Sequence, residues 1–206
     1  MRRVVVYDFD KTLTYKDTLT GFFTHCAEKN VLYPLKLFVY GVAMVLAKFG
    51  FMDNTRLKKT GVKLFLQSKS RDEITECAGS YGDKIVFNKL FYEVTEGKET
   101  AGSDDTVCVV SASFEEYLTL LFSSKIVVNG SRLKYTNDRV SGLEINCYKD
   151  KKVQRLTEGG IKKIDILYTD SYSDAPLARI SEKIVVVSGD RQTVYDNYKA
   201  FERHFQ

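Results

Sequence analysis

The sequence predicts an α/β fold in which helices flank an open, parallel β-sheet. Four apolar runs rich in valine and isoleucine have the pattern of strands that are buried on both faces. Helical stretches at residues 113–123 and 150–160 fall between them, and Gly159 and Gly160 mark the end of the second. Strands that alternate with helices indicate this fold, in which ligands bind beyond the carboxyl ends of the strands. The strand runs are residues 2–10, 105–113, 163–174 and 183–190.

A long insertion separates the first two strands. It contains four helical stretches, with helix N-caps expected at Asn54 and Ser70, and Glu73 lies three residues after Ser70 as in a capping box. A crossover of this length does more than connect two strands, so we expect a helical cap over the active edge of the sheet. The helical stretches are residues 17–30, 31–52, 54–68 and 70–86. The predicted division is a cap at residues 16–99 and a catalytic core at residues 1–15 and 100–206.

The segment Val31–Met52 is apolar enough, and about long enough, to span a bilayer. However, Lys36 and Lys48 lie inside it, and Pro34 and Gly41 interrupt it. The favoured interpretation is therefore a buried pair of cap helices. The alternative is a surface that enters a membrane or binds a lipid tail.

Residues 127–148 have the pattern of a β excursion from the main sheet. Turns are expected at Asn129-Gly130 and at Ser141-Gly142, because such dipeptides favour hairpin turns.

Composition places the chain among ordinary globular proteins. Its 206 residues suffice for one well-packed core and a smaller second module. The formal charge of +4 comes from scattered lysines, and the 13 Phe and 13 Tyr do not interleave with basic residues as in a strand-binding surface. We therefore expect no nucleic-acid partner.

The cysteines predict thiols rather than a metal site or disulfides. They show no CxxC pairing, and with only two histidines, His25 and His204, a zinc site is not expected. The amino-terminal apolar run meets Asp8 too early to serve as a signal peptide. The prediction is a cytoplasmic protein with free thiols. The cysteines are Cys26, Cys77, Cys108 and Cys147.

Three strand ends carry groups that can act together on a phosphate ester. Asp8 and Asp170 can share a hard cation such as Mg²⁺ through oxygen, and a carboxylate beside Mg²⁺ can attack phosphorus to give an aspartyl phosphate. Ser111 offers a hydroxyl and Lys152 a cation for the charge that phosphoryl transfer builds. Asp10 must then protonate the leaving oxygen and activate water, and crowding by Asp8 would raise its pKa for that task.

The motifs "DFDKTLT", "VVSAS", "KKVQRL" and "DSYSD" resemble, in that order, the four motifs of the haloacid dehalogenase-like superfamily of phosphohydrolases. The resemblance covers essentially the whole chain and implies a Rossmann-like core. The insertion is similar to the C1 cap of subfamily IB, which contains phosphoserine phosphatase. Within it, "CYKDKKVQRL" and "DSYSDAPL" look closest to the branch with bacterial phosphatidylglycerophosphate phosphatases.

The resemblance implies a role for each motif residue. Asp8 would be the nucleophile, Asp10 the acid/base, Ser111 with Ala112 the phosphate-binding site, and Lys152 the charge neutraliser. The "DKT" at Asp10 also resembles the phosphorylated motif of cation-pumping ATPases, but the threonine-leucine-threonine that follows sets the register so that Asp8 attacks.

The resemblance also implies a Mg²⁺ site. Asp8 and Asp170 would supply carboxylates and Asp10 its backbone carbonyl, while Asp174 would orient Asp170 or its water. The sequence departs from the family pattern at Lys11 and at Thr169, where Gly, or Ser in the first case, is usual. Lys149, Lys151, Lys162 and Lys163 lie close enough to Lys152 in sequence to compete for its role.

These residues predict a Mg²⁺-dependent hydrolase of a phosphomonoester, either a small molecule or a lipid-like phosphate. Phosphoserine phosphatase is one alternative, in which Asp17 and Arg56 of the cap region would contact the substrate. The other is a non-catalytic phosphate-binding module that retains the fold. Peripheral membrane contact is the less favoured interpretation, and a monomer or a homodimer is expected.

Overall fold

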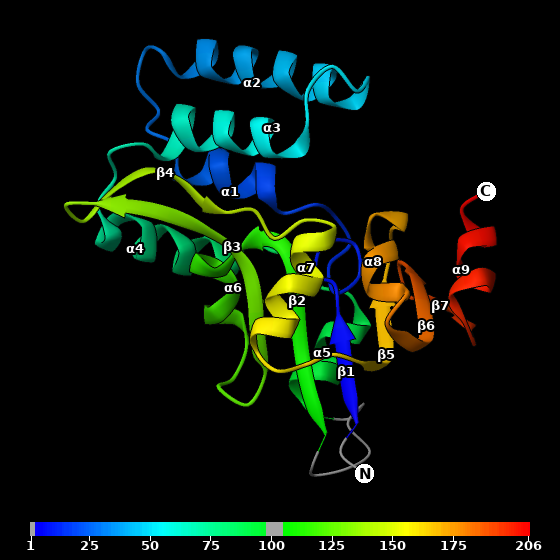
Figure 1. The fold of residues 1–206 in the computed structure, drawn as a ribbon. Helices are drawn as coiled ribbons and strands as arrows, with labels where there is room; N and C mark the ends of the chain where they lie inside the picture. The colour runs from blue at the N-terminus through cyan, green and yellow to red at the C-terminus, as the bar shows by residue number, and fades with distance from the viewer. Residues whose placement is uncertain (1–2, 98–104) are drawn as a thin grey trace.

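A sheet of seven strands forms the centre of the part of the chain that the structure describes (Figure 1). The structure is a computed structural model and describes residues 3–97 and 105–206. The strand order is β4-β3-β2-β1-β5-β6-β7, with parallel pairing from β3 to β6 and antiparallel pairing at both edges. The strands are β1 (Val4–Tyr7), β2 (Thr106–Phe114), β3 (Val127–Thr136), β4 (Arg139–Ile145), β5 (Ile164–Thr169), β6 (Ser181–Ser188) and β7 (Arg191–Tyr195).

The α/β prediction is confirmed, and all four predicted strands are present. β1 lies between β2 and β5 and pairs in parallel with both. Its side chains enter a hydrophobic cluster on each face of the sheet, with Val5 and Tyr7 on one side and Val6 on the other. A short strand that is apolar on both faces can only be central, which places the residues that follow β1 in the middle of the sheet edge.

The predicted turns of the β excursion are wrong. β3 and β4 form a hairpin whose turn is Asn137-Asp138, and both residues have positive φ, 49° and 60°. Asn and Asp tolerate that backbone conformation, which two-residue hairpin turns require. Gly130 instead lies within β3, where a Cβ atom would come within 2.7 Å of the Ser113 carbonyl oxygen.

The helical insertion is confirmed as a stack of helices above the sheet (Figure 1). The capping box of Ser70 and Glu73 is present. The N-cap of the third helix, however, is Asp53 and not Asn54, because the Asp53 carboxylate accepts the backbone N–H of Arg56 at 2.8 Å. The elements of the insertion are α1 (Leu19–Cys26), α2 (Tyr33–Lys48), α3 (Asn54–Gly61), the π-helical turn η1 (Val62–Leu66) and α4 (Arg71–Gly82).

The remaining helices flank the sheet. They are α5 (Lys89–Thr95), α6 (Glu115–Leu121), α7 (Asp150–Glu158), the 3₁₀ turn η2 (Tyr172–Asp174), α8 (Ala175–Ala178) and α9 (Tyr198–His204). The α5 segment contacts the core: Asn88 donates to the Thr12 carbonyl at 2.8 Å, and the Phe91 and Phe122 rings lie 5.6 Å apart. The boundary expected at residues 99 and 100 falls outside the described residues.

The α2 helix is exposed, so the expected burial of this segment is wrong. Tyr40 and Ala43 are its buried residues, whereas Phe38 and Phe49 are 68% and 70% exposed. The reason is its place in the stack: α2 is the outermost helix and lies on α3 with only one of its sides (Figure 1). In the described part of the chain, no helix combines the length and apolar character needed to cross a membrane.

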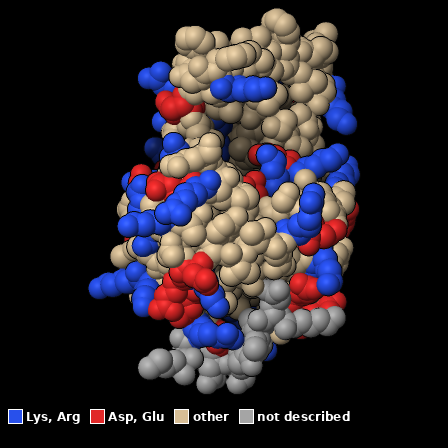
Figure 2. All heavy atoms as spheres, turned by 90° about the vertical axis from the view of Figure 1, so that its right-hand side faces the viewer, with Lys and Arg blue, Asp and Glu red and all other residues tan. Residues whose placement is uncertain are grey.

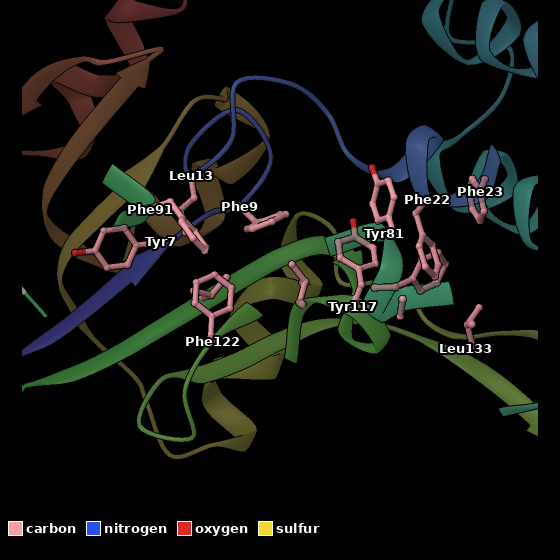
Figure 3. Packing of buried hydrophobic residues seen from close by; sticks show 14 of the residues in the cluster. Tyr7, Phe9, Leu13, Phe22, Phe23, Tyr81, Phe91, Tyr117, Phe122 and Leu133 are labelled. Atoms are coloured by element: carbon pink, nitrogen blue, oxygen red, sulfur yellow. The ribbon is translucent and has the colours of Figure 1, made fainter. Parts of the chain in front are cut away.

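Aromatic packing joins the base of the cap to the core (Figure 3). Phe22 of α1 lies 5.9 Å from the ring of Phe114 in β2 and 4.8 Å from that of Tyr117 in α6. Aromatic pairs at such distances add about 0.5–1.5 kcal/mol each beyond the area that they bury. These contacts fix α1, the first helix of the cap, against the carboxyl end of β2.

A disulfide joins Cys26 of α1 to Cys77 of α4, so the free-thiol prediction is wrong for these two residues. Their Cα atoms are 5.6 Å apart across a sequence separation of 51 residues. The other two cysteines, Cys108 and Cys147, are buried thiols.

Reduction of this disulfide should destabilise the cap. A loop of this length gives a loss of up to about 4 kcal/mol in the free energy of unfolding. Urea unfolding of the wild type with and without reductant measures the loss, and the double variant Cys26→Ser/Cys77→Ser, which reductant should leave unchanged, is the control. An identical midpoint for the wild type in both conditions would contradict the prediction.

Candidate active site

A pocket of about 240 Å³ opens at the carboxyl ends of β1, β2 and β5, beneath the cap. Figure 2 shows the surface hollowed between the cap and the core. The walls of the pocket combine carboxylates, lysines and hydroxyls, which suits an anionic ligand held together with a cation. The lining residues are Asp8, Asp10, Lys11, Asp17, Leu19, Asn54, Lys58, Ser111, Ala112, Ser113, Tyr148, Lys152, Asp170, Ser171 and Ser173.

Asp8 is fixed at the end of β1 by its backbone and its side chain. Its N–H donates to the Tyr168 carbonyl of β5 at 2.9 Å, and its Oδ1 accepts from Lys152 Nζ at 2.8 Å. Burial raises the pKa of Asp8 well above its usual range, and nearby Asp174 and Asp170 add to this, while Lys152 opposes the shift. The ionised form of Asp8 therefore depends on positive charge beside it.

Lys152 of α7 bridges two carboxylates. Its Nζ lies 2.7 Å from Asp174 Oδ1 as well as 2.8 Å from Asp8, and the side chain is 3% exposed. Burial alone lowers the pKa of Lys152, but Asp174 and Asp8 outweigh it and raise the pKa above its ordinary value. Lys152 is therefore a permanent cation beside Asp8.

Thr169 explains one departure from the family pattern. Its hydroxyl donates to Asp174 Oδ2 at 2.8 Å, which orients that carboxylate toward Lys152. Two of the four neighbouring lysines are engaged elsewhere: Lys151 donates to Gln154, and Lys163 pairs with Glu182.

Asp10 is held by donors from both the cap and the core. Its Oδ1 accepts the Thr18 N–H at 2.8 Å and the Thr18 hydroxyl at 2.6 Å, and its Oδ2 accepts the Ser113 hydroxyl at 2.6 Å. Burial, with a contribution from Asp17, raises the pKa of Asp10 to about 6. Near neutral pH this carboxyl can therefore both give and take a proton.

The loop after β1 is closed by a threonine. The Thr14 hydroxyl accepts the Lys11 N–H at 3.0 Å and donates to the Lys16 carbonyl at 2.8 Å. Lys11 has φ +59°, a conformation that favours glycine. This accounts for the glycine that is usual at this position, and it places a lysine in the pocket wall instead.

Ser111 and Ala112 lie near the carboxyl end of β2 and line the pocket. Ser111 is buried, and its hydroxyl accepts the Ser113 N–H at 3.0 Å. The same serine, Ser113, donates to Asp10, so Ser111 and Asp10 are linked through one residue.

Lys58 is a pocket residue that sequence reasoning missed. It lies on α3 of the cap, is 1% exposed, and donates to three oxygens: the Ala112 carbonyl at 2.5 Å, the Ser131 hydroxyl at 2.9 Å and Asn146 Oδ1 at 2.5 Å. These three acceptors match the three donors of an ammonium group. Burial lowers the pKa of Lys58 to about 7. In the sequence it is one of two adjacent lysines, and no local signal separates it from its exposed neighbour Lys59.

The donor set fits a hard divalent cation. Asp8 and Asp170 both line the pocket, and burial together with Asp174 raises the pKa of Asp170 to about 6. Buried carboxylates whose pKa values are raised are stabilised in their charged form by a shared cation. Within residues 3–97 and 105–206, no group of three or more His, Cys, Asp or Glu side chains forms a metal site. A site of two carboxylates and the Asp10 carbonyl would be compatible with that finding.

The two cap-region residues expected to contact substrate differ in position. Asp17 lines the pocket, and its Oδ1 accepts the Leu19 N–H at 3.1 Å. Arg56 is not brought to the pocket: its side chain is 75% exposed and pairs with Asp53 at 3.3 Å.

The fold and the pocket define a protein with an α/β core, a buried aspartate-lysine pair and a helical cap. Residues 5–179 match the family model described as haloacid dehalogenase-like hydrolase. The chain therefore belongs to the haloacid dehalogenase-like hydrolases.

Solved structures share the fold at low sequence identity. A protein of unknown function from Bordetella pertussis Tohama I has a TM-score of 0.71 and 17% identity, over 86% of each chain. A substrate-bound phosphoserine phosphatase has a TM-score of 0.62 and 13% identity, over 99% of this chain and 98% of that one. A phospho-aspartyl intermediate analogue of phosphoserine phosphatase has a TM-score of 0.57 and 13% identity, over 90% and 86%. No curated protein sequence matches the chain.

The buried Lys58 should make stability depend on pH. Its pKa is about 7 in the folded protein and 10.5 as its ordinary value, so between these values the unfolded chain binds more protons. We therefore compare the free energy of unfolding of the wild type with that of Lys58→Met. The difference should increase in favour of the wild type between pH 7 and pH 10.5, by at most ~1.4 kcal/mol per pH unit. Below pH 7 the difference should be constant. Urea unfolding at several pH values tests this, with Lys59→Met as the control; parallel curves for wild type and Lys58→Met would contradict it.

Proposed function

We propose that the protein is a Mg²⁺-dependent phosphomonoester hydrolase that works through an aspartyl-phosphate intermediate. The observation that supports this most is the meeting of Asp8, Lys152 and Asp10 in one buried pocket, with the nucleophile paired at 2.8 Å and the acid/base held by three hydrogen bonds. Membership of the hydrolase family, and the fold shared with phosphoserine phosphatases, support a phosphoric monoester hydrolase.

In the first half-reaction, Asp8 attacks phosphorus while the ester oxygen leaves. Lys152 opposes the rise in the pKa of Asp8 and offsets charge on the phosphoryl oxygens, and the Ser111 hydroxyl can donate a hydrogen bond to one of them. Asp10 gives its proton to the leaving oxygen. A Mg²⁺ ion held by Asp8, Asp170 and the Asp10 carbonyl would supply positive charge where the carboxylates and the phosphate repel each other.

In the second half-reaction, Asp10 takes a proton from water, which attacks phosphorus and releases Asp8. The Thr18 and Ser113 donors favour the ionised form of Asp10 and burial favours the protonated form, so neither form is strongly preferred near neutral pH. An acid group in this position promotes hydrolysis of the intermediate, which argues against a long-lived phosphorylated switch and against a non-catalytic binding module.

The proposed substrate is a small-molecule or lipid-like phosphate. The pocket of about 240 Å³ accommodates a phosphoryl group and a small leaving group, and a larger substrate must extend along the cap. Phosphoserine is the alternative substrate, supported by the phosphoserine phosphatases among the structures with this fold. The outward position of Arg56 counts against it, because it leaves the serine carboxylate without that partner.

The cytoplasmic location and the choice between monomer and homodimer stay predictions. The Cys26–Cys77 disulfide is a feature that favours an oxidising compartment, since disulfides are rare in reducing ones.

Asp8→Asn should abolish turnover. The amide is a poor nucleophile and cannot form the intermediate, so hydrolysis of p-nitrophenyl phosphate in Mg²⁺ should fall roughly a thousandfold or more. Asp72→Asn, an exposed carboxylate on α4, is the matched control and should keep full activity. Undiminished turnover by Asp8→Asn would end the proposed mechanism.

Removal of Mg²⁺ with a chelator should stop hydrolysis, and its return should restore it. Asp170→Asn should require more than about tenfold higher Mg²⁺ for half-maximal rate, because changes even to groups around a metal's direct ligands shift affinity by that factor. A Mg²⁺ titration of the rate measures this, again beside Asp72→Asn. The same Mg²⁺ requirement in Asp170→Asn and wild type would remove Asp170 from the proposed metal site.

A further inference from the structure

The outward side of α2 is apolar along its whole length. Leu35, Phe38, Val42, Val45 and Phe49 follow one another at spacings of three or four residues and are 59%, 68%, 45%, 54% and 70% exposed. We call these five residues the α2 outer face. A surface helix normally places such a stripe toward the core and polar residues toward water. In α2 the stripe faces away from the protein.

The exposed apolar surface continues beyond both ends of the helix. Val31 is 92% exposed before it and Phe51 is 79% exposed after it. The 16 residues of α2 alone span about 24 Å. Figure 1 shows α2 at the far end of the cap with no described element on its outer side, and Figure 2 shows a mostly uncharged surface there. A continuous exposed apolar patch marks a site of contact with a membrane or another protein.

The charges within residues 29–52, the segment that carries the α2 outer face, are of one sign, and Glu28 and Asp53 flank this segment. Residues 29–52 contain three lysines, Lys29, Lys36 and Lys48, and neither Asp nor Glu. Lys29 and Lys48 are exposed near the two ends of α2, whereas Lys36 is half-buried on the side of the helix that carries Tyr40. An apolar helix face with cations at its ends matches the surface of an anionic phospholipid bilayer, where headgroups attract each nearby lysine by about 1 kcal/mol and the acyl boundary accepts the apolar side chains.

A second copy of the chain fits this face less well. A twofold dimer through it would bring the same patch against itself, together with the exposed lysines at its ends, Lys29 and Lys48. No carboxylate within residues 29–52 could pair with them, and like charges at an interface oppose association.

We propose that the α2 outer face docks onto the surface of an anionic phospholipid bilayer, with the helix lying in the plane of the headgroups. The helix lies on the bilayer and does not cross it, in keeping with its 16 residues. Asn54, which lines the active-site pocket, is three residues from Phe51, so docking brings the pocket close to the bilayer. This inference goes beyond the proposed function, because it does not depend on the chemistry in the pocket.

Sedimentation of the full chain with vesicles tests the proposal. We expect the wild type to pellet with vesicles of phosphatidylcholine and phosphatidylglycerol, and at least about tenfold less well with phosphatidylcholine alone. Phe38→Asp/Phe49→Asp should lose about tenfold or more of the binding to the anionic vesicles. Leu120→Asp/Val194→Asp, which adds the same charge at residues that are 53% and 58% exposed elsewhere, is the control and should bind more tightly than the α2 variant.

Two results would overturn the proposal. One is a wild type that stays in solution with the anionic vesicles, or that binds no better than Phe38→Asp/Phe49→Asp. The other is a dimer in gel filtration that only the α2 variant converts to monomer, which would assign the face to a second copy. Turnover of p-nitrophenyl phosphate by the same samples reports on folding and on the proposed function separately. Binding without turnover would count against the function alone, and turnover without binding against the docking surface alone.

Discussion

The buried contact between Lys152 and Asp8 is the constraint on which the site depends. It joins the end of β1 to α7, and through Asp174 to the turn after β5, so three segments far apart in sequence must converge on one ammonium group. Desolvating these charges is costly, and loss of one partner would leave another charge buried without compensation. The order of the sheet meets this requirement, because β1 lies between β2 and β5 and their carboxyl ends share one edge.

Hydrogen bonds of Thr18 connect the cap to Asp10, the proposed acid/base. Its N–H and hydroxyl bind Asp10, its hydroxyl also lies 2.7 Å from that of Tyr117, and its carbonyl accepts from Tyr81 of α4 at 2.6 Å. Figure 3 shows Tyr81 and Tyr117 next to each other in the aromatic cluster, and their rings lie 5.6 Å apart. A movement of α4 relative to the core must therefore alter the hydrogen bonds that set the pKa of Asp10. Lys58 adds a second link, from α3 to Ala112 of β2 and Ser131 of β3. The hydrogen bonds that hold Asp10 and those that hold the cap on the core therefore share Thr18.

Much of the core was predictable because its signals are local. Apolar runs gave the strands, and the polar residues at their ends, including Asp8 and Asp170, do line one pocket. What could not be predicted depends on contacts across the fold. The Cys26–Cys77 disulfide links residues 51 apart without a motif, and Lys58 differs from Lys59 only in which way α3 turns it. The hairpin turn was misplaced because Asn-Gly and Ser-Gly pairs fit turns but can also lie in strands, where Gly130 is required by the nearby Ser113 carbonyl.

The exposure of α2 could not be predicted from its sequence, for a different physical reason. A helix that is apolar on most of its sides does not specify which side faces inward, so the choice is made by what fits beneath it. The Tyr40 ring packs 5.6 Å from Phe23 and 5.5 Å from Phe65, and this aromatic contact occupies the inner side of the helix. Everything opposite is left in water, where each Å² of apolar surface forgoes about 25 cal/mol relative to burial. Such a face is stabilised only when it contacts another apolar phase. The three lysines of residues 29–52 favour an apolar phase whose surface carries negative charge.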